Sequence, residues 1–186
     1  MTMLIAIAAG VVLAASAGLR AFLPLFAVGV ASRTIGWDLA TEMQWLASNT
    51  ALICFGIASA IEVAADKIPV VDHVLDAVHT ITGPIAGAIA GLSVWLNLPP
   101  PAAVVLALVV GAPIAGGVHL VAATTRVKSS AVSGGTLNPI ASTAEDGATL
   151  AAIAVAIFAP LLALVLSIVL VLVLVRYIAK RKRSAA

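Results

Sequence analysis

The chain has 186 residues, of which 62% are hydrophobic and only 10% are charged. An average soluble domain carries about 25% charged residues. This composition all but excludes a soluble enzyme, a nucleic-acid-binding protein and a disordered chain, and it indicates an integral membrane protein. The formal net charge of +2 is unevenly distributed, because five of the ten basic residues lie within residues 176–186. The sequence therefore predicts a weakly acidic membrane body followed by a basic tail.

Long runs without charged residues predict the membrane spans. A spanning helix needs about 20 apolar residues, and five segments meet this requirement: residues 1–32, 43–61, the two halves of 77–125 on either side of a triple proline, and 148–175. We therefore expect an all-α fold, a polytopic transmembrane helical bundle of about five spans. It would form one domain over residues 1–178, with a basic cytoplasmic tail over residues 179–186.

Two of these segments are too long for one straight helix. Residues 4–31 would extend for about 42 Å, against a hydrocarbon core of about 30 Å, and residues 148–175 are similarly long. Proline removes a helical hydrogen bond and clashes with the preceding turn, so we expect kinked or broken helices. The expected breaks lie at Pro24, Pro69, Pro113 and Pro160.

The basic tail predicts the orientation of the chain. Lys and Arg favour the cytoplasmic side of a membrane, so we expect a multi-pass protein of the cell (inner) membrane with a cytoplasmic C-terminus. Five spans then place the N-terminus outside, Arg33 inside, and residues 66–80 and 126–147 outside. In the alternative, the first segment is a hairpin broken at Arg20 and the N-terminus is cytoplasmic.

A ladder of small residues predicts close helix packing. Gly83, Gly87 and Gly91 recur at every fourth position, and small residues let helix backbones approach closely in lipid. This face is expected to pack either within the chain or in a homo-oligomer. The lipid bilayer is the expected partner, and no nucleic-acid partner is expected.

Two ionisable residues interrupt apolar segments. Such residues are costly in a membrane and are functional candidates by default. Arg20 is expected to face the protein interior, either in a structural ion pair with a carboxylate or in contact with an anion or counter-ion. His119 is either a satisfied structural group or a member of a polar pathway.

The main acidic stretch, residues 62–80, places carboxylates and imidazoles on shared helix faces, because its polar residues recur at intervals of three and four. It predicts a short amphipathic helix that is either a solvated surface or a site for cations or protons, since His titrates near neutrality. Asp76 and His79 also have the spacing found in di-metal bundles. The candidate site residues are Glu62, Asp66, Asp72, Asp76 and His79, and the candidate metal ligands are Asp72, His73, Asp76 and His79.

Residues 126–147 form the only long polar stretch and are expected to be a loop. Asn138 precedes a proline in a typical turn sequence, and Ser142 and Glu145 have the spacing of a capping box for the next helix. In the alternative, Glu145 and Asp146 pair with basic residues or line a site together with Asn138. The basic residues considered for this pairing are Arg20, Arg126 and Lys128.

Three segments together resemble the bacterial membrane proteins catalogued as domain of unknown function 4126. They are residues 18–25 (Gly-Leu-Arg-Ala-Phe-Leu-Pro-Leu), residues 62–76 with their Asp-Lys-Ile-Pro sequence, and residues 133–146. The resemblance covers nearly the whole chain. It implies a small multi-span membrane protein, and it implies no particular activity or catalytic residue.

The sequence contains no P-loop, HExxH, GxSxG or CxxC motif, so no cofactor and no catalytic residue is expected, and a non-enzymatic role is favoured. We expect a small transporter or channel-like protein whose polar residues surround a half-membrane cavity for a small solute, cation, proton or lipid headgroup. The alternatives are a non-catalytic scaffold or assembly partner and, less favoured, an intramembrane enzyme acting on a lipid-linked substrate. Convergence of the polar residues favours a transporter or an enzyme, whereas separate exposure to water favours a scaffold.

Overall fold

The computed structural model describes residues 3–95, 98–133 and 137–159, and eleven further residues between 162 and 176. Within these residues the chain is helical and has no strand, which confirms the all-α prediction. The side chains of Asp72, His73 and Asn138, residue Pro160 and the basic tail lie outside the described residues, so the predictions made for them stay predictions.

The elements follow one another with short connections. They are α1 (Met3–Leu19), α2 (Phe22–Ile35), the 3₁₀ helix η1 (Thr41–Ala47), α3 (Asn49–Ala65), α4 (Pro69–Trp95), α5 (Pro100–Leu106), the π-helical turn η2 (Ala107–Gly111), α6 (Ala112–Ser133) and α7 (Asn138–Phe158).

Length and hydropathy make this a membrane protein. Within the described residues, three helical stretches are long and apolar enough to cross a bilayer, namely Val74–Trp95, Pro100–Ser129 and Pro139–Phe158. Helices η1 and α3 together form a fourth candidate, bent by 62°. Helices α1 and α2 are apolar but shorter than the roughly 20 residues that a span needs.

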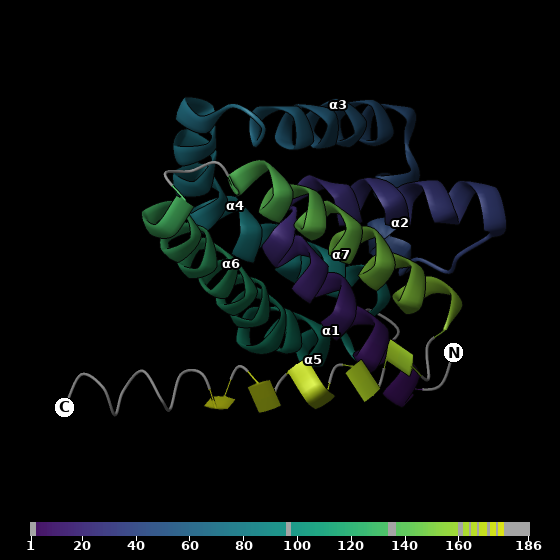
Figure 1. Cartoon of the computed structure of the whole chain (residues 1–186). Helices are drawn as coiled ribbons and strands as arrows, with labels where there is room; N and C mark the ends of the chain where they lie inside the picture. Colours follow the sequence, from purple (N-terminus) through teal and green to yellow (C-terminus); the bar gives the residue numbers. More distant parts are fainter. Residues whose placement is uncertain are drawn as a thin grey trace.

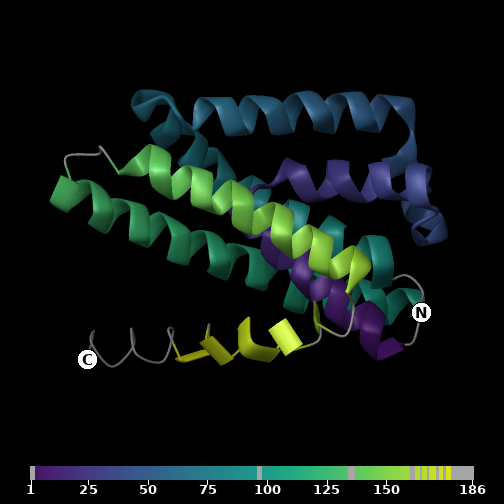
Figure 2. The ribbon, with the colours of Figure 1, turned by 45° about the vertical axis from the view of Figure 1, so that its right-hand side comes forward.

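The first apolar segment is broken, as predicted, but the break lies at Arg20 and Ala21 rather than at Pro24. Pro24 lies in the first turn of α2, where the backbone N–H groups have no intrahelical partner and a proline is tolerated. In Figures 1 and 2 the chain turns back at this break, so α2 runs toward the end of the molecule from which α1 starts.

The other prolines do not all break helices. Pro69 begins α4, so the predicted short amphipathic helix is the first part of one 27-residue helix and not a separate element. Pro113 does not break its helix. It follows the π-helical turn η2, because a proline has no N–H to donate to the carbonyl four residues earlier and the hydrogen-bond register shifts instead.

The prediction of a long loop over residues 126–147 is wrong. Helix α6 continues to Ser133, and α7 begins at Asn138 with a proline in its first turn, a position that suits proline. Ser142 and Glu145 therefore lie inside α7 and do not form its capping box. The polar groups of both residues are bonded to other parts of the chain. They therefore do not need contact with water, and this stretch can be helical.

The glycine face of α4 packs inside the chain. A Cβ atom built on Gly87 would overlap Ala115 of α6, and one built on Gly91 would overlap the ring of Trp95. Trp95 is fully buried and also covers Gly10 of α1, while its Nε1 donates to a backbone carbonyl of that helix. Gly87 thus brings α4 close to α1 and α6, whereas Gly83 and Gly91 leave room for the His79 and Trp95 side chains of α4 itself. The homo-oligomer stays a prediction, and it would need another surface.

The predicted fifth segment is two segments. Helix α7 ends before Ala159, whose backbone leaves the helical region (φ −135°, ψ 64°), as expected for a residue that precedes a proline. The described residues of 162–176 then run back along the bundle (Figures 1 and 2). Leu170 and Val173 line a cavity with Leu19 and Glu145. These two residues therefore lie near Glu145, whereas a single straight span over residues 148–175 would carry Val173 far away from it.

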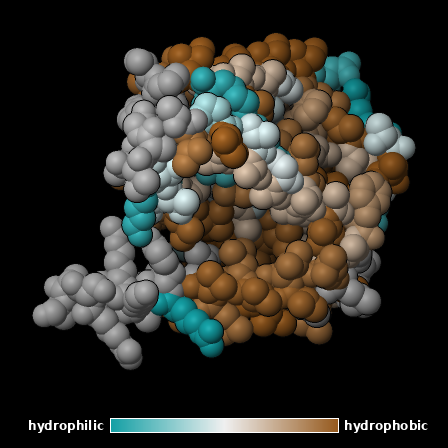
Figure 3. Space-filling view, in the orientation of Figure 1, coloured by the Kyte–Doolittle hydropathy of each residue, from teal (hydrophilic) through white to brown (hydrophobic). Residues whose placement is uncertain are grey.

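One end of the bundle collects the polar residues. The end of α3, the start of α4, the end of α6 and the start of α7 meet there, on the left of Figure 2. We call this region the polar end. Figure 3 shows that apolar residues cover most of the face in view, around a hollow near its centre. The buried charged groups lie at the polar end, whereas Arg33, Asp38 and Glu42 are exposed at the other end.

Candidate functional site

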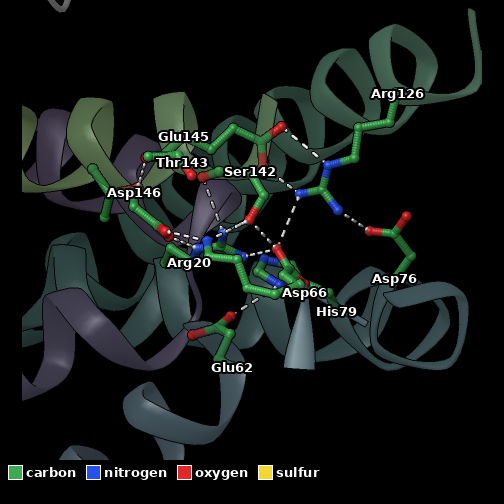
Figure 4. Close-up of polar contacts among 12 residues, drawn as sticks. Arg20, Glu62, Asp66, Asp76, His79, Arg126, Ser142, Thr143, Glu145 and Asp146 are labelled. Atoms are coloured by element: carbon green, nitrogen blue, oxygen red, sulfur yellow. Dashed lines mark hydrogen bonds and ion pairs between the residues drawn. The ribbon is translucent and has the colours of Figure 1, made fainter. Parts of the chain in front are cut away.

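Arg20 is the most deeply buried charge of the polar end, with 1% of its surface exposed. Its Nη1 forms an ion pair with Asp66, and its Nε lies 2.6 Å from Oδ1 of Asp146. Its Nη2 donates to Oγ of Ser142 at 3.0 Å and to the carbonyl of the same residue at 3.3 Å. The predicted pairing of Arg20 with a carboxylate is therefore present, and it joins the α1–α2 break to α3 and α7 (Figure 4).

The shape of the guanidinium explains why an arginine occupies this position. It presents five N–H donors in a rigid planar fork, so one side chain contacts Asp66 on one side and α7 on the other. Burying an isolated charge costs on the order of several kcal/mol of folding free energy. Pairing offsets this cost only when the remaining N–H donors also have acceptors. Each of the three nitrogens of Arg20 has an acceptor.

A second buried arginine, Arg126 on α6, extends the network. Its Nη1 donates to Oδ1 of Asp76 at 2.9 Å, and its Nε and Nη2 form a bidentate pair with Glu145. Its Nη2 also lies 3.8 Å from Oδ2 of Asp66, so this carboxylate lies between the two arginines. From the sequence, Arg126 is predicted only as a possible pairing partner of Glu145 and Asp146. Its spacing of seven from His119, which places both on one face of α6, is the signal that identifies it as a site residue.

Helix α7 contributes one continuous polar face. Ser142, Glu145 and Asp146 are three and four residues apart, so they point in one direction. Asp146 also pairs with Lys67 at 3.0 Å, and the Nζ atom of Lys67 lies 3.1 Å from Oγ of Ser142. Ser142 and Lys67 are not predictable as site residues, because Ser142 has the spacing of a helix cap and Lys67 is a partly exposed lysine beside acidic residues.

Glu62 holds the start of α2. Its side chain is buried, and its carboxylate accepts the backbone N–H of Ala21 at 2.8 Å and that of Phe22 at 3.3 Å. Helix α2 has no side-chain cap of its own, so Glu62 of α3 satisfies the unpaired donors that a helix N-terminus leaves. A carboxylate is also favoured by the positive end of the helix dipole.

His79 and His119 lie next to this cap. Nδ1 of His79 is 3.1 Å from Oε1 of Glu62, and its Nε2 is 3.2 Å from the carbonyl of Ala17. The two imidazole rings are stacked, with centroids 4.7 Å apart and planes inclined by 11°. Nε2 of His119 is 3.3 Å from the hydroxyl of Thr80. The two histidines therefore connect α3, α4 and α6 with the end of α1.

Most predicted site residues converge on this region. Those with described side chains that belong to the network are Arg20, Glu62, Asp66, Asp76, His79, His119, Glu145 and Asp146. In the described part of the chain, no group of three His, Cys, Asp or Glu residues is arranged to hold a metal ion. Asp76 binds Arg126 and His79 contacts Glu62, so these two candidate metal ligands have protein partners.

Two apolar cavities lie beside the network. They have volumes of about 360 and 390 Å³ and are lined by residues of α1, α6, α7 and the described part of 162–176. Glu145 is the charged residue that lines the cavity of about 390 Å³. The charged side chains of the network bond directly to one another. The polar cavity expected from the sequence stays a prediction, and the charged side chains described here form connected ion pairs.

The fold and the site together define a polytopic helical membrane protein in which a buried ion-pair network ties the helices together at one end. The chain belongs to the family described as domain of unknown function (DUF4126), whose profile matches residues 7–180. This match confirms the resemblance drawn from the sequence. No curated protein and no solved structure matches the chain.

Proposed function

We propose that the protein is a small membrane transporter for a cation, either an inorganic ion or a small organic cationic solute. The observation that carries the proposal is the burial of charged side chains from the α1–α2 break, α3, α4, α6 and α7 in one connected group at the polar end. Ionisable residues inside a membrane protein are costly and typically mark ion or substrate pathways.

The charge of the network favours a cationic ligand. Among the described side chains it contains three cationic residues and five carboxylates, so negative charge is in excess even when one histidine of the network is protonated. A site lined by one excess sign attracts and concentrates ions of the other sign. The carboxylates are Glu62, Asp66, Asp76, Glu145 and Asp146, and the cationic residues are Arg20, Lys67 and Arg126.

The broken first segment supports the same proposal. Discontinuous helices with polar residues at the break form the ligand sites of many transporters. Helix α1 has 17 residues and α2 has 14, which correspond to lengths of about 25 and 21 Å. Helix α1 begins and α2 ends at the same end of the molecule (Figure 1). With that end at one surface of a bilayer core of about 30 Å, the break and Arg20 would lie within the core.

Asp66 is the centre of the proposed mechanism. Its carboxylate contacts Arg20 and lies 3.8 Å from Arg126, so it links the α1–α2 break with α6. A cation bound to Asp66 would compete with both arginines and weaken the bonds that hold the polar end closed. When Asp66 binds the cation, Arg20 keeps Asp146 and Arg126 keeps Asp76 and Glu145, so neither arginine would be left as an uncompensated buried charge.

The scaffold alternative explains the site less well. A scaffold is expected to expose its charged residues separately to water, whereas Arg20, Asp66 and Arg126 are buried and bonded to one another. The less favoured enzyme alternative has no specific observation in its support.

Uptake into liposomes tests the proposal. The purified protein would be reconstituted, and the entry of sodium, potassium and methylammonium would be measured under an inside-negative potential. We expect at least one of these cations to enter faster than in protein-free vesicles. The Asp66→Asn variant is expected to lose this uptake, while Asp38→Asn, an exposed aspartate at the other end, is expected to keep it. Equal rates with and without protein for all cations would contradict the proposal.

A further inference from the structure

We propose that Glu62 and His79 form a proton-binding site that holds the break between α1 and α2. The inference rests on the proposed transport function only for the use of the proton, which would couple cation movement to protons. The site itself follows from the hydrogen bonds around the break. These place one hydrogen between Oε1 of Glu62 and Nδ1 of His79.

The positions of the acceptors fix the number of hydrogens. Nε2 of His79 lies 3.2 Å from the carbonyl oxygen of Ala17, and a carbonyl only accepts, so Nε2 carries a hydrogen. In a neutral imidazole the other nitrogen is then an acceptor. That nitrogen lies 3.1 Å from Oε1 of Glu62, and an ionised carboxylate is also an acceptor only. Two facing lone pairs repel, so a second hydrogen lies between them.

The backbone around the break places this hydrogen on His79. The oxygens of Glu62 already accept the N–H groups of Ala21 and Phe22, which is the arrangement of a carboxylate. The hydrogen is therefore assigned to Nδ1, which makes the pair an imidazolium and a carboxylate. This assignment follows from the heavy-atom contacts, as is usual for histidine hydrogens.

The pair also replaces a missing helical hydrogen bond. In a continuous helix the N–H of Ala21 would donate to the carbonyl of Ala17, four residues earlier. Here the N–H of Ala21 donates to Glu62, and the carbonyl of Ala17 accepts from His79. Glu62 and His79 thus bridge the two ends of the break through the shared hydrogen. Loss of that hydrogen would set Nδ1 against Oε1 and favour separation of the pair, which would release both backbone groups.

The groups around the pair are compatible with one extra proton. The hydroxyl of Thr80 donates to the backbone carbonyl of Asp76 at 2.9 Å, so Nε2 of His119 is the donor to Thr80. The stacked His119 ring therefore needs no second proton. The other charged groups of the network come from the α1–α2 break, the end of α3, α4, α6 and α7. They are Arg20, Asp66, Lys67, Asp76, Arg126, Glu145 and Asp146.

Nitrogen-15 NMR of histidine side chains tests the site directly. The chain has three histidines, so the full-length protein in lipid nanodiscs gives three sets of signals, which His73→Gln and His119→Gln assign. At pH 7.5 an exposed histidine is protonated on both nitrogens in only about one tenth of molecules, given an ordinary pKa near 6.5. We expect His79 to carry both hydrogens in most molecules.

The variants separate this site from a merely structural histidine. Glu62→Gln is expected to reduce the doubly protonated fraction of His79 to about that of an exposed histidine, while Glu42→Gln, exposed at the other end of the molecule, leaves it unchanged. A wild-type His79 with a single N–H at pH 7.5 would overturn the proposal, and this result does not depend on the folding of any variant. Absence of cation uptake together with a doubly protonated His79 would refute the transport function and leave the proton site intact.

Discussion

Replacing Arg20 by methionine is predicted to destabilise the protein strongly. The methionine keeps much of the length of the side chain and removes the pairs with Asp66 and Asp146. Asp146 keeps Lys67 at 3.0 Å and is partly exposed. Asp66 is 5% exposed, and its remaining cation is Arg126 at 3.8 Å. Removing one partner of a buried pair costs about 3–5 kcal/mol, and most of this loss is expected to come from Asp66.

A second substitution identifies the source of the loss. In Arg20→Met with Asp66→Asn, the position of the unpaired carboxylate becomes neutral, so we expect recovery of at least about half of the 3–5 kcal/mol. The free energy of unfolding would be measured by titration of the micelle-bound protein with sodium dodecyl sulfate, with helicity as the signal. Arg33→Met, at an exposed position at the end of α2, is the control and should change stability by less than about 0.5 kcal/mol. The reasoning is refuted if Arg20→Met costs no more than the control, or if Asp66→Asn brings no recovery.

Two further predictions concern packing and topology. Gly10→Ala would drive a methyl group into the buried tryptophan ring and is expected to lower the free energy of unfolding by about 1–3 kcal/mol. Gly147→Ala, with open space around it, should not destabilise the protein. Equal effects of the two variants in the same titration would contradict the packing. In a Cys54→Ser background, Lys67→Cys is expected to react with a membrane-impermeant maleimide from the cytoplasmic side and Asp38→Cys from the other. The reason is that the basic C-terminal segment favours the cytoplasm and its described residues run toward the polar end; labelling of both from one side would refute this topology.

Hydropathy and the positions of a few charges predict a large part of this structure. They give the membrane class, the all-α fold and the break near Arg20, because a long apolar run with an internal charge has few other solutions in a bilayer. They also predict that Arg20 is paired. The identity of its partners is not predictable in this way, since Asp66 and Asp146 are 46 and 126 residues away.

Local patterns were misleading where two structures share one spacing. Ser142 and Glu145, three residues apart, fit both a capping box and one face of a helix. The structure places them inside α7, where Glu145 binds Arg126. The spacing of neighbouring residues contains no information about this tertiary partner. The reversal after α7 is hidden for a similar reason, because residues 148–175 contain no charge and only a proline marks the turn.

Cation uptake by the variant that combines Arg20→Met with Asp66→Asn tests the central claim most directly. This variant is expected to be folded but to lack the arginine and the carboxylate at the centre of the network. If the network is the working part of a transporter, the folded variant takes up cations no faster than protein-free vesicles. If it takes up cations at the wild-type rate, the ion pairs serve only stability and the proposed function is contradicted.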